Sequence, residues 1–266
     1  FKCREMLPSQ KFIYYGDNDR APYGNLPPEI ISRYVFSAAE ELAAYSPEVL
    51  VFACNPVAPC GGKSWRKKSA SPFRGAYPPL LAGGKIGGDG LVLVTRATYE
   101  SRAFAALTRR AEKLCPSAHF YPYPCDLLAG KIEDTLAAAA DATYTAELPA
   151  RKFSFIILGC THYAHVREAI ARFYGCPVFD GAEGLARRLA VTLAAEKSSL
   201  IAPGNAGKNV ENENADPRVT TFAPEMQNFA DVAAENVSSD GKVLFIGSGK
   251  EKNRTFYEHS FAGDLS

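Results

Sequence analysis

The sequence predicts an α/β protein built on mainly parallel central sheets flanked by helices. Two observations indicate this class. Short apolar runs alternate with longer helical segments along the chain, and apolar residues make up 47% of its 266 positions, enough to bury a sizeable core. Because strand, helix and strand follow one another in this order, we expect parallel strands with helices on both faces of each sheet.

The expected strands are short apolar runs at residues 11–15, 49–53, 91–95, 119–123, 153–158, 177–179 and 243–246. Segments with the length and composition of helices lie between them, at residues 28–44, 98–114, 127–142, 162–174 and 182–196. Two stretches interrupt this alternation and are predicted as loops: residues 61–90, crowded with Gly, Pro, Ser and Lys, and the polar residues 198–216. We expect a boundary between two domains near the first of them.

Charge and composition exclude several classes of function. Thirty basic and 29 acidic side chains leave a net charge of +1, so the chain has no field to hold a polyanion and nucleic acid is not an expected partner. Apolar runs stay well below the roughly 20 residues that cross a bilayer, and the first residues lack the apolar core of a signal peptide. We expect a cytoplasmic protein with no membrane partner.

Seven cysteines form an odd set without a Cys-x-x-Cys pair. This pattern argues against a disulfide framework and against a zinc site, so free thiols and no metal are expected. Two of them, Cys54 and Cys160, directly follow expected strands. In open α/β sheets ligands bind at the carboxyl ends of the strands, where loop amides and helix N-termini favour a thiolate.

Each candidate also has a simpler interpretation. A free cysteine is most often a small buried hydrophobe, although two at matching positions weaken that interpretation. The segment Pro22-Tyr23-Gly24 is by itself a turn, Thr98 is by itself a helix N-cap, and Glu133 is by itself a charge on a solvated helix face. Composition alone does not separate these interpretations.

The order of the motifs along nearly the whole chain resembles glutamate racemase, a member of the aspartate/glutamate racemase family. The most specific motif is Leu158-Gly159-Cys160-Thr161-His162-Tyr163. The others are Tyr14-Tyr15-Gly16-Asp17, Pro22-Tyr23-Gly24, Ala53-Cys54-Asn55, Thr95-x-x-Thr98, and the interval from Cys125 to Glu133.

The resemblance implies two similar domains with the active site in the cleft between them: residues 1–78 and 182–266 form one, and residues 79–181 the other. It further implies that L- and D-glutamate are interconverted without a cofactor, to supply peptidoglycan synthesis. Cys54 and Cys160 would exchange the α-proton from opposite faces, assisted by Glu133 and His162. Groups that bind the substrate would come from Tyr23, Gly24, Asn55, Pro56, Thr98 and Thr161. A homodimer is compatible with the resemblance, which leaves the oligomeric state open.

Two departures from the family pattern favour other interpretations. The family begins with a strand that ends in Asp-Ser-Gly, whereas this sequence begins after that point, and Pro56 stands where the family has threonine. Because proline lacks the hydroxyl and the backbone N–H, it removes two donors from the pocket. A racemase-like binding module with weak or no activity therefore stays open, as does a racemase for aspartate or another amino acid. Redox sensing by Cys54 and Cys60 is a third alternative.

Overall fold

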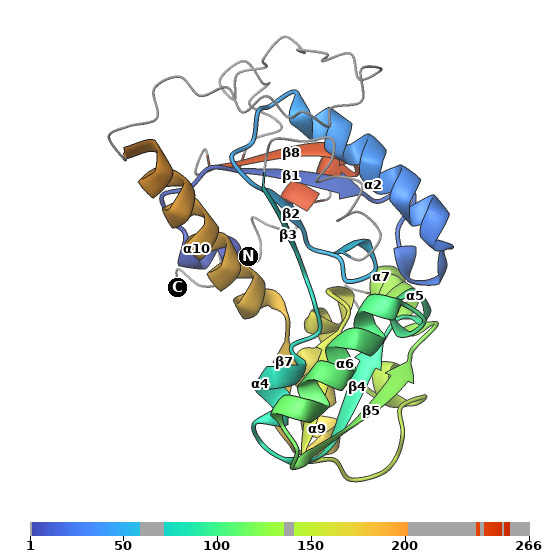
Figure 1. Cartoon of the computed structure of the whole chain (residues 1–266). Coiled ribbons are helices and arrows are strands. Elements are labelled where there is room, and N and C mark those ends of the chain that lie inside the picture. Colours follow the sequence, from blue (N-terminus) through green and yellow to red (C-terminus); the bar gives the residue numbers. More distant parts are fainter. Residues whose placement is uncertain are drawn as a thin grey trace.

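The computed structural model describes residues 2–58, 72–135, 141–201, 238–239, 242–251 and 253–255. The elements fall into two groups (Figure 1). Those from α4 to β7 gather in the lower part of the view, and the elements near the two ends of the chain gather in the upper part. The architecture is α/β, with parallel sheets flanked by helices.

A four-stranded parallel sheet forms the centre of the lower group, in the order β5-β4-β6-β7. Its strands are β4 (Gly88–Val94), β5 (Ala118–Pro124), β6 (Phe155–Gly159) and β7 (Val178–Asp180). All of β6 and the residues of β4 from Gly90 to Val94 are buried because both faces of the sheet are covered by helices.

Alternate residues of the central strands serve two separate core clusters. Leu91 and Leu93 face one side, where α7 (Leu128–Thr135) and α9 (Arg167–Tyr174) pack. Val92 and Val94 face the other side, against α4 (Leu80–Gly84) and α6 (Arg102–Leu114). This alternation is the period-2 pattern of a strand buried on both faces.

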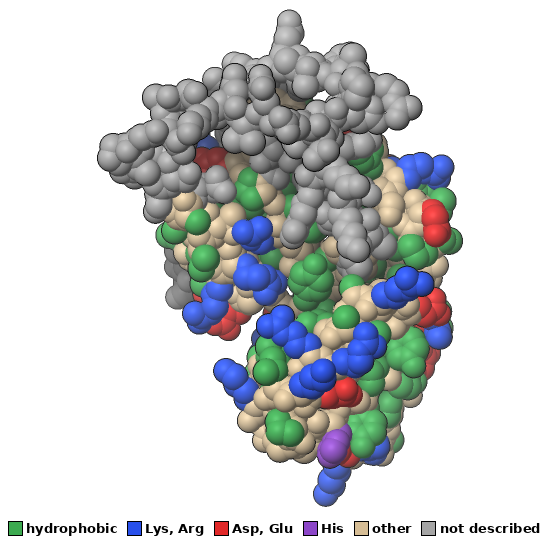
Figure 2. Space-filling model, in the orientation of Figure 1, with side chains coloured by type: hydrophobic (Ala, Val, Ile, Leu, Met, Phe, Trp, Pro, Cys, Tyr) green, Lys and Arg blue, Asp and Glu red, His purple; other side chains and the backbone are tan. Residues whose placement is uncertain are grey.

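Helix α6 is strongly amphipathic. Phe104 and Ala111 are buried against the sheet, whereas Arg102, Arg109, Arg110 and Lys113 are exposed. Figure 2 shows Lys and Arg side chains gathered over this helix, with Asp and Glu side chains nearby on the same face. The face of α6 that packs on the sheet is apolar and the opposite face is charged, which is typical of a surface helix in a globular protein.

Polar side chains divide the segment that we expected to be one helix at residues 98–114. A short helix, α5 (Arg96–Tyr99), is capped by Thr95, whose side chain accepts a hydrogen bond from the backbone N–H of Thr98. The next helix, α6, is capped by Ser101, whose side chain accepts a hydrogen bond from the backbone N–H of Phe104. Each hydroxyl satisfies a helix N-terminus, so the chain turns between them.

One further expected helix is also divided. Residues 162–174 form a 3₁₀ segment, η2 (His162–Val166), followed by α9. The segment at residues 127–142 contains α7 and the start of α8 (Asp141–Thr145), with residues 136–140 outside the described part of the chain.

The upper group contains two separate parallel pairs of strands. β1 (Phe12–Asp17) pairs with β8 (Val243–Ser248), and β2 (Leu50–Phe52) pairs with β3 (Phe73–Gly75). The connection from β1 to β2 runs through η1 (Tyr23–Asn25) and α2 (Pro28–Ala43). Pro28 opens α2 at a position where its missing N–H is not needed.

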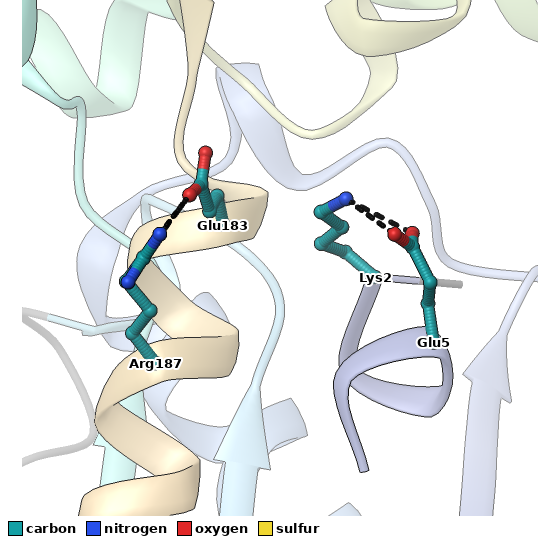
Figure 3. Close-up of polar contacts among 4 residues, drawn as sticks. All are labelled: Lys2, Glu5, Glu183 and Arg187. Carbon is teal, nitrogen blue, oxygen red and sulfur yellow. Dashed lines mark hydrogen bonds and ion pairs between the residues drawn. The ribbon is translucent and has the colours of Figure 1, made fainter. Parts of the chain in front are cut away.

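The long helix α10 (Ala182–Ile201) lies beside the short helix α1 (Lys2–Met6). Figure 3 shows charged pairs on both: Lys2 with Glu5 on α1, and Glu183 with Arg187 on α10. All four side chains are exposed, and surface pairs of this kind contribute little to stability.

The prediction of a continuous loop at residues 61–90 was wrong for its second half. Strand β3, helix α4 and the first residues of β4 lie there. Gly83 and Gly84 are buried in α4, and a side chain at either would meet Phe155 or Cys115. Glycines that are typical of a loop are thus required by close packing of α4 on the sheet.

None of the helices in the described part of the chain combines the length and apolar character needed to cross a bilayer.

The packing of Gly90 provides a test of the central sheet. A Cβ atom at Gly90 would lie 2.0 Å from Cε2 of Phe155, in the middle of the sheet. We expect Gly90→Ala to lower the free energy of unfolding by about 3 kcal/mol, because the ring has no room to move. Gly130→Ala is the matched control, since nothing lies within 4 Å of a Cβ there. Alanine in that helix should stabilise by up to about 1 kcal/mol. Urea unfolding measures both, and equal stability of the two variants would contradict this packing.

Candidate active site

The register of the central sheet places two predicted site segments side by side. Val94 of β4 is the partner of Gly159 of β6. The residues that follow, Thr95 and Cys160, therefore leave adjacent strands at the same level, where neighbouring backbones are about 4.8 Å apart. This is the carboxyl edge of the sheet, where ligands of α/β proteins bind.

The Cys160 thiol lies in a desolvated position. It is 7% exposed, and burial raises its pKa to about 11, while hydrogen bonds from the backbone of His162 and Tyr163 act in the lowering direction. Its Sγ is 3.8 Å from Nδ1 of His162. The group is therefore a thiol at neutral pH, and a base beside it is needed to produce the thiolate.

Cys54 has a different environment. It is half-buried, and its carbonyl accepts a hydrogen bond of 3.3 Å from the N–H of Ala58 in the turn after β2. Its side chain packs with Tyr23 and Ala97 against a small apolar cluster centred on Ile31. Ala97 belongs to the turn after β4, so this cluster joins the end of β2 to the carboxyl edge of the four-stranded sheet.

Gly24 makes the second close approach between these two parts of the molecule. It is buried, and a Cβ atom there would lie 2.8 Å from Cγ2 of Thr95. The Thr95 hydroxyl in turn donates to Oγ1 of Thr98 at 3.1 Å. Only glycine permits the backbone of η1 to approach this turn so closely. The structure thus brings Gly24 to Thr95, which bonds Thr98, and brings Tyr23 and Cys54 into one cluster with Ala97 of the same turn.

The hydroxyl of Tyr23 is already engaged by a carboxylate. It donates a hydrogen bond to Oδ2 of Asp17, and Nε of Arg20 donates to Oδ1 of the same carboxylate at 2.7 Å. Burial and this hydrogen bond raise the pKa of Tyr23. The sequence motifs did not indicate Arg20, although the spacing of three residues between Asp17, Arg20 and Tyr23 is a local signal for such a cluster. Its geometry leaves the backbone of η1, not the Tyr23 hydroxyl, to meet a ligand.

Asn55 carries an unsatisfied polar atom. Its side chain is only 6% exposed, and Oδ1 accepts no hydrogen bond from the described residues. A buried acceptor without a donor costs roughly 1–3 kcal/mol, so such atoms in native structures call for a specific explanation. Pro56 follows it in the same turn and is also buried. The arrangement suits a ligand that brings an N–H donor to Asn55.

Thr161 and Glu133 are the remaining predicted site residues. Thr161 is exposed at the start of η2, beside Cys160. Glu133 belongs to α7, but its side chain lies outside the described part of the structure. Within the described ranges, no group of three or more His, Cys, Asp or Glu side chains is arranged to hold a metal ion.

Two pockets of about 410 Å³ each lie beside β5. One lies at the end of β5, where Cys125, Lys131 and Tyr144 contribute to its lining. The other lies along the outer edge of β5, where Glu112, His119 and Tyr121 contribute. Neither is lined by Cys54 or Cys160, so the candidate site is defined by converging strand ends and not by cavity volume.

Comparison with known proteins assigns the family. Over 198 residues the chain is 32% identical to a glutamate racemase of Clostridium perfringens, an alignment that covers 71% of this chain and 75% of that protein. This chain belongs to the glutamate racemase family. A glutamate racemase of Thermus thermophilus is 30% identical over 220 residues, covering 80% of this chain and 81% of its own length. No family model matches the chain.

Solved structures show the same fold. The Escherichia coli glutamate racemase, in complex with L-glutamate and the activator UDP-MurNAc-Ala, superposes with a TM-score of 0.64 at 23% identity, covering 73% of this chain and 76% of that one. The α/β architecture described above is therefore that of the glutamate racemase family.

The burial of Cys160 predicts how the stability of this racemase family member depends on pH. An ordinary thiol titrates near 9.0 and the folded Cys160 near 11, so between these values the folded state keeps a proton that the unfolded chain has lost. The stabilisation, roughly 2–3 kcal/mol, is complete below pH 9 and is lost as pH rises towards 11. Urea unfolding at pH 8 and pH 10.5 measures it.

Cys160→Ser should remove this part of the pH dependence. Cys125, whose pKa burial raises to about 12, contributes in the same direction and remains in that variant. The account of Cys160 is wrong if wild type and Cys160→Ser lose equal stability between the two pH values.

Proposed function

We propose that this chain interconverts L- and D-glutamate by direct proton transfer, with Cys54 and Cys160 as the two acid–base groups and without a cofactor. One observation carries the proposal. The half-buried Cys54 shares an apolar cluster with Ala97, and the turn that contains Ala97 leaves the sheet beside Cys160. Within a family of glutamate racemases, two thiols that approach one edge from different sheets support chemistry on opposite faces of one carbon.

In the proposed reaction, the thiolate of one cysteine removes the α-proton and the electron pair of the C–H bond remains on the substrate as a carbanion. The thiol of the other cysteine then donates its proton to the opposite face. By the family pattern, Cys54 deprotonates D-glutamate and Cys160 the L form. The two cysteines exchange protonation states in each turnover, so one must begin as thiolate and the other as thiol.

The environments of the two thiols support this division of states. The raised pKa of Cys160 favours the thiol form there. When Cys160 acts as the base, His162 is the nearby group that can accept its proton, since Nδ1 lies 3.8 Å from Sγ. The family resemblance assigns Glu133, like His162, to assisting proton transfer at the cysteines.

Substrate binding is proposed at the same edge. The unsatisfied Oδ1 of Asn55 would accept from the substrate ammonium. Hydroxyls of Thr98 and Thr161 and the backbone of Tyr23 and Gly24 would hold the carboxylates, since hydroxyl and N–H donors suit anions at strand ends. We further propose that the chain forms two similar domains with the site between them. Residues 1–78 and 182–266 form one domain, and residues 79–181 form the other.

Pro56 specifically favours a second function, in which the chain keeps the fold and serves as a binding module with weak or no activity. It lies directly after Asn55 and is buried in the candidate site. A proline there offers neither an N–H nor a hydroxyl to a carboxylate. Binding without turnover is therefore the outcome to separate from catalysis.

We expect the purified protein to exchange the α-proton of glutamate with solvent deuterium in the absence of added cofactor. Proton NMR of each enantiomer in D₂O measures the exchange. Cys54→Ser and Cys160→Ser should each abolish racemisation, because inversion requires both faces. Matched controls are Cys176→Ser for the half-buried thiol and Cys115→Ser for the buried one, and both should keep wild-type activity.

Several outcomes would refute the racemase proposal. Exchange that requires pyridoxal phosphate would make the thiols bystanders. Absence of exchange with either enantiomer at high protein concentration, together with measurable glutamate binding, would support the binding module. Faster exchange with aspartate than with glutamate would reassign the substrate.

Pro56 yields a separate prediction. Pro56→Thr restores an N–H and a hydroxyl, each worth about 1.5–3 kcal/mol when it bonds a charged group. We expect kcat/KM for glutamate to rise at least about tenfold, which corresponds to about 1.4 kcal/mol. Pro56→Ala restores only the N–H and separates the two contributions. Unchanged activity in both variants would show that Pro56 does not limit the reaction.

A further inference from the structure

We propose that Asn25, Asp126 and Arg96 form a clasp that positions η1 over the candidate site, with Asp126 as its central positioning residue. The inference rests on the proposed function for its kinetic consequence but not for its geometry. None of the three residues belongs to the set assigned above to proton transfer or substrate binding.

The first contact of the clasp joins the two groups of elements. Nδ2 of Asn25, at the end of η1, donates a hydrogen bond of 2.9 Å to the backbone carbonyl of Asp126. Asn25 directly follows Gly24, which packs against Thr95. A side chain one residue away from the closest backbone approach thus holds the loop after β5.

The second contact fixes the loop after β5 to the turn after β4. Nε of Arg96 donates to Oδ1 of Asp126 at 3.1 Å, and Nη2 donates to Oδ2 at 2.5 Å. This is the two-pronged arrangement that gives an Arg–carboxylate pair a defined orientation. Arg96 lies between Thr95, which faces Gly24, and Ala97, which packs with Cys54.

The clasp also reaches the loop that carries Cys160. The carbonyl of Cys125, the residue before Asp126, accepts a hydrogen bond of 3.0 Å from the hydroxyl of Tyr163. Tyr163 is fully buried three residues after Cys160. One short segment, Cys125 and Asp126, therefore contacts three of the segments that bring candidate groups to the site, and the segment that carries Cys54 joins them through Ala97.

This arrangement predicts a function in ligand retention and not in the chemical step. The hydrogen bonds of Asp126 run to Arg96 and Asn25, neither of which is a proposed acid–base group. Loosening these bonds would let η1 move away from Thr95 and Ala97, which uncovers Cys54 and weakens the hold on the substrate. KM should rise, whereas kcat should change little because none of the three clasp residues supplies a group to the proton transfer.

The variants are Asn25→Ala, which removes the hydrogen bond between the two groups, and Asp126→Asn, which weakens the bond to Arg96. Asp89→Asn is the matched control. Asp89 pairs with Arg151 at the opposite end of β4, and the exposures of the two pairs are similar, 43% and 41% for Arg96–Asp126 against 48% and 37% for Arg151–Asp89. Equal losses of stability are expected from Asp126→Asn and Asp89→Asn, since both are exposed pairs.

Two measurements test the clasp. KM for both glutamate enantiomers should rise about threefold to tenfold in Asn25→Ala and Asp126→Asn, with kcat within twofold of wild type, and should stay unchanged in Asp89→Asn. Independently of activity, alkylation of Cys54 by iodoacetamide, followed by mass spectrometry, should become at least threefold faster in the first two variants only.

The outcomes separate this proposal from the racemase proposal. Faster alkylation of Cys54 without any glutamate exchange in wild type would support the clasp and refute the racemase. Unchanged KM and an unchanged rate of Cys54 alkylation in Asn25→Ala would overturn the clasp. Equal changes of KM and of the alkylation rate in Asp126→Asn and Asp89→Asn would overturn it as well. If Asp126→Asn fails to fold, Asn25→Ala, which alters one exposed side chain, decides the matter.

Discussion

The alignment of β4 between β5 and β6 is the constraint on which the rest of the site depends. Because Gly90 has no side chain, the ring of Phe155 lies directly beside the β4 backbone, and the two strands keep the register that pairs Val94 with Gly159. Parallel strands in register end together, so Thr95 and Cys160 leave the sheet at one edge. A slip of one residue would turn Leu91 and Leu93 from one core cluster into the other.

Burial makes the two candidate thiols unequal. Cys160 belongs to the main core cluster, where desolvation outweighs the backbone hydrogen bonds and keeps the proton on sulfur. Cys54 lies on the margin of a much smaller cluster and is partly open to solvent. A pair of acid–base groups that must hold one proton between them benefits from such inequality, since two identical buried thiols would both stay protonated at neutral pH.

Most polar groups around the site form hydrogen bonds with one another. The Tyr23 hydroxyl is held by Asp17, Thr95 is held by Thr98, and Asp126 is held by Arg96. These bonds fix loops that have few buried apolar residues of their own. Oδ1 of Asn55 is the exception in this part of the molecule, because it is buried and accepts no hydrogen bond from the described residues. The contrast supports a scaffold that is satisfied internally and offers its unpaired acceptor to a ligand.

The sequence by itself determined the α/β class, the approximate strands and the two strand-end cysteines, because these depend on local periodicity. The motif from Leu158 to Tyr163 and the alternating apolar runs can be identified without tertiary information. Local patterns gave wrong predictions where tertiary packing determines the secondary structure. Gly83 and Gly84, typical loop residues, are buried in α4, and the expected helix at residues 98–114 divides at Ser101. Only the tertiary structure revealed the approach of Gly24 to Thr95 and the contact of Asn25 with Asp126. Asn25 and Asp126 are 101 positions apart, and no local periodicity encodes which loops meet once two separate sheets have packed.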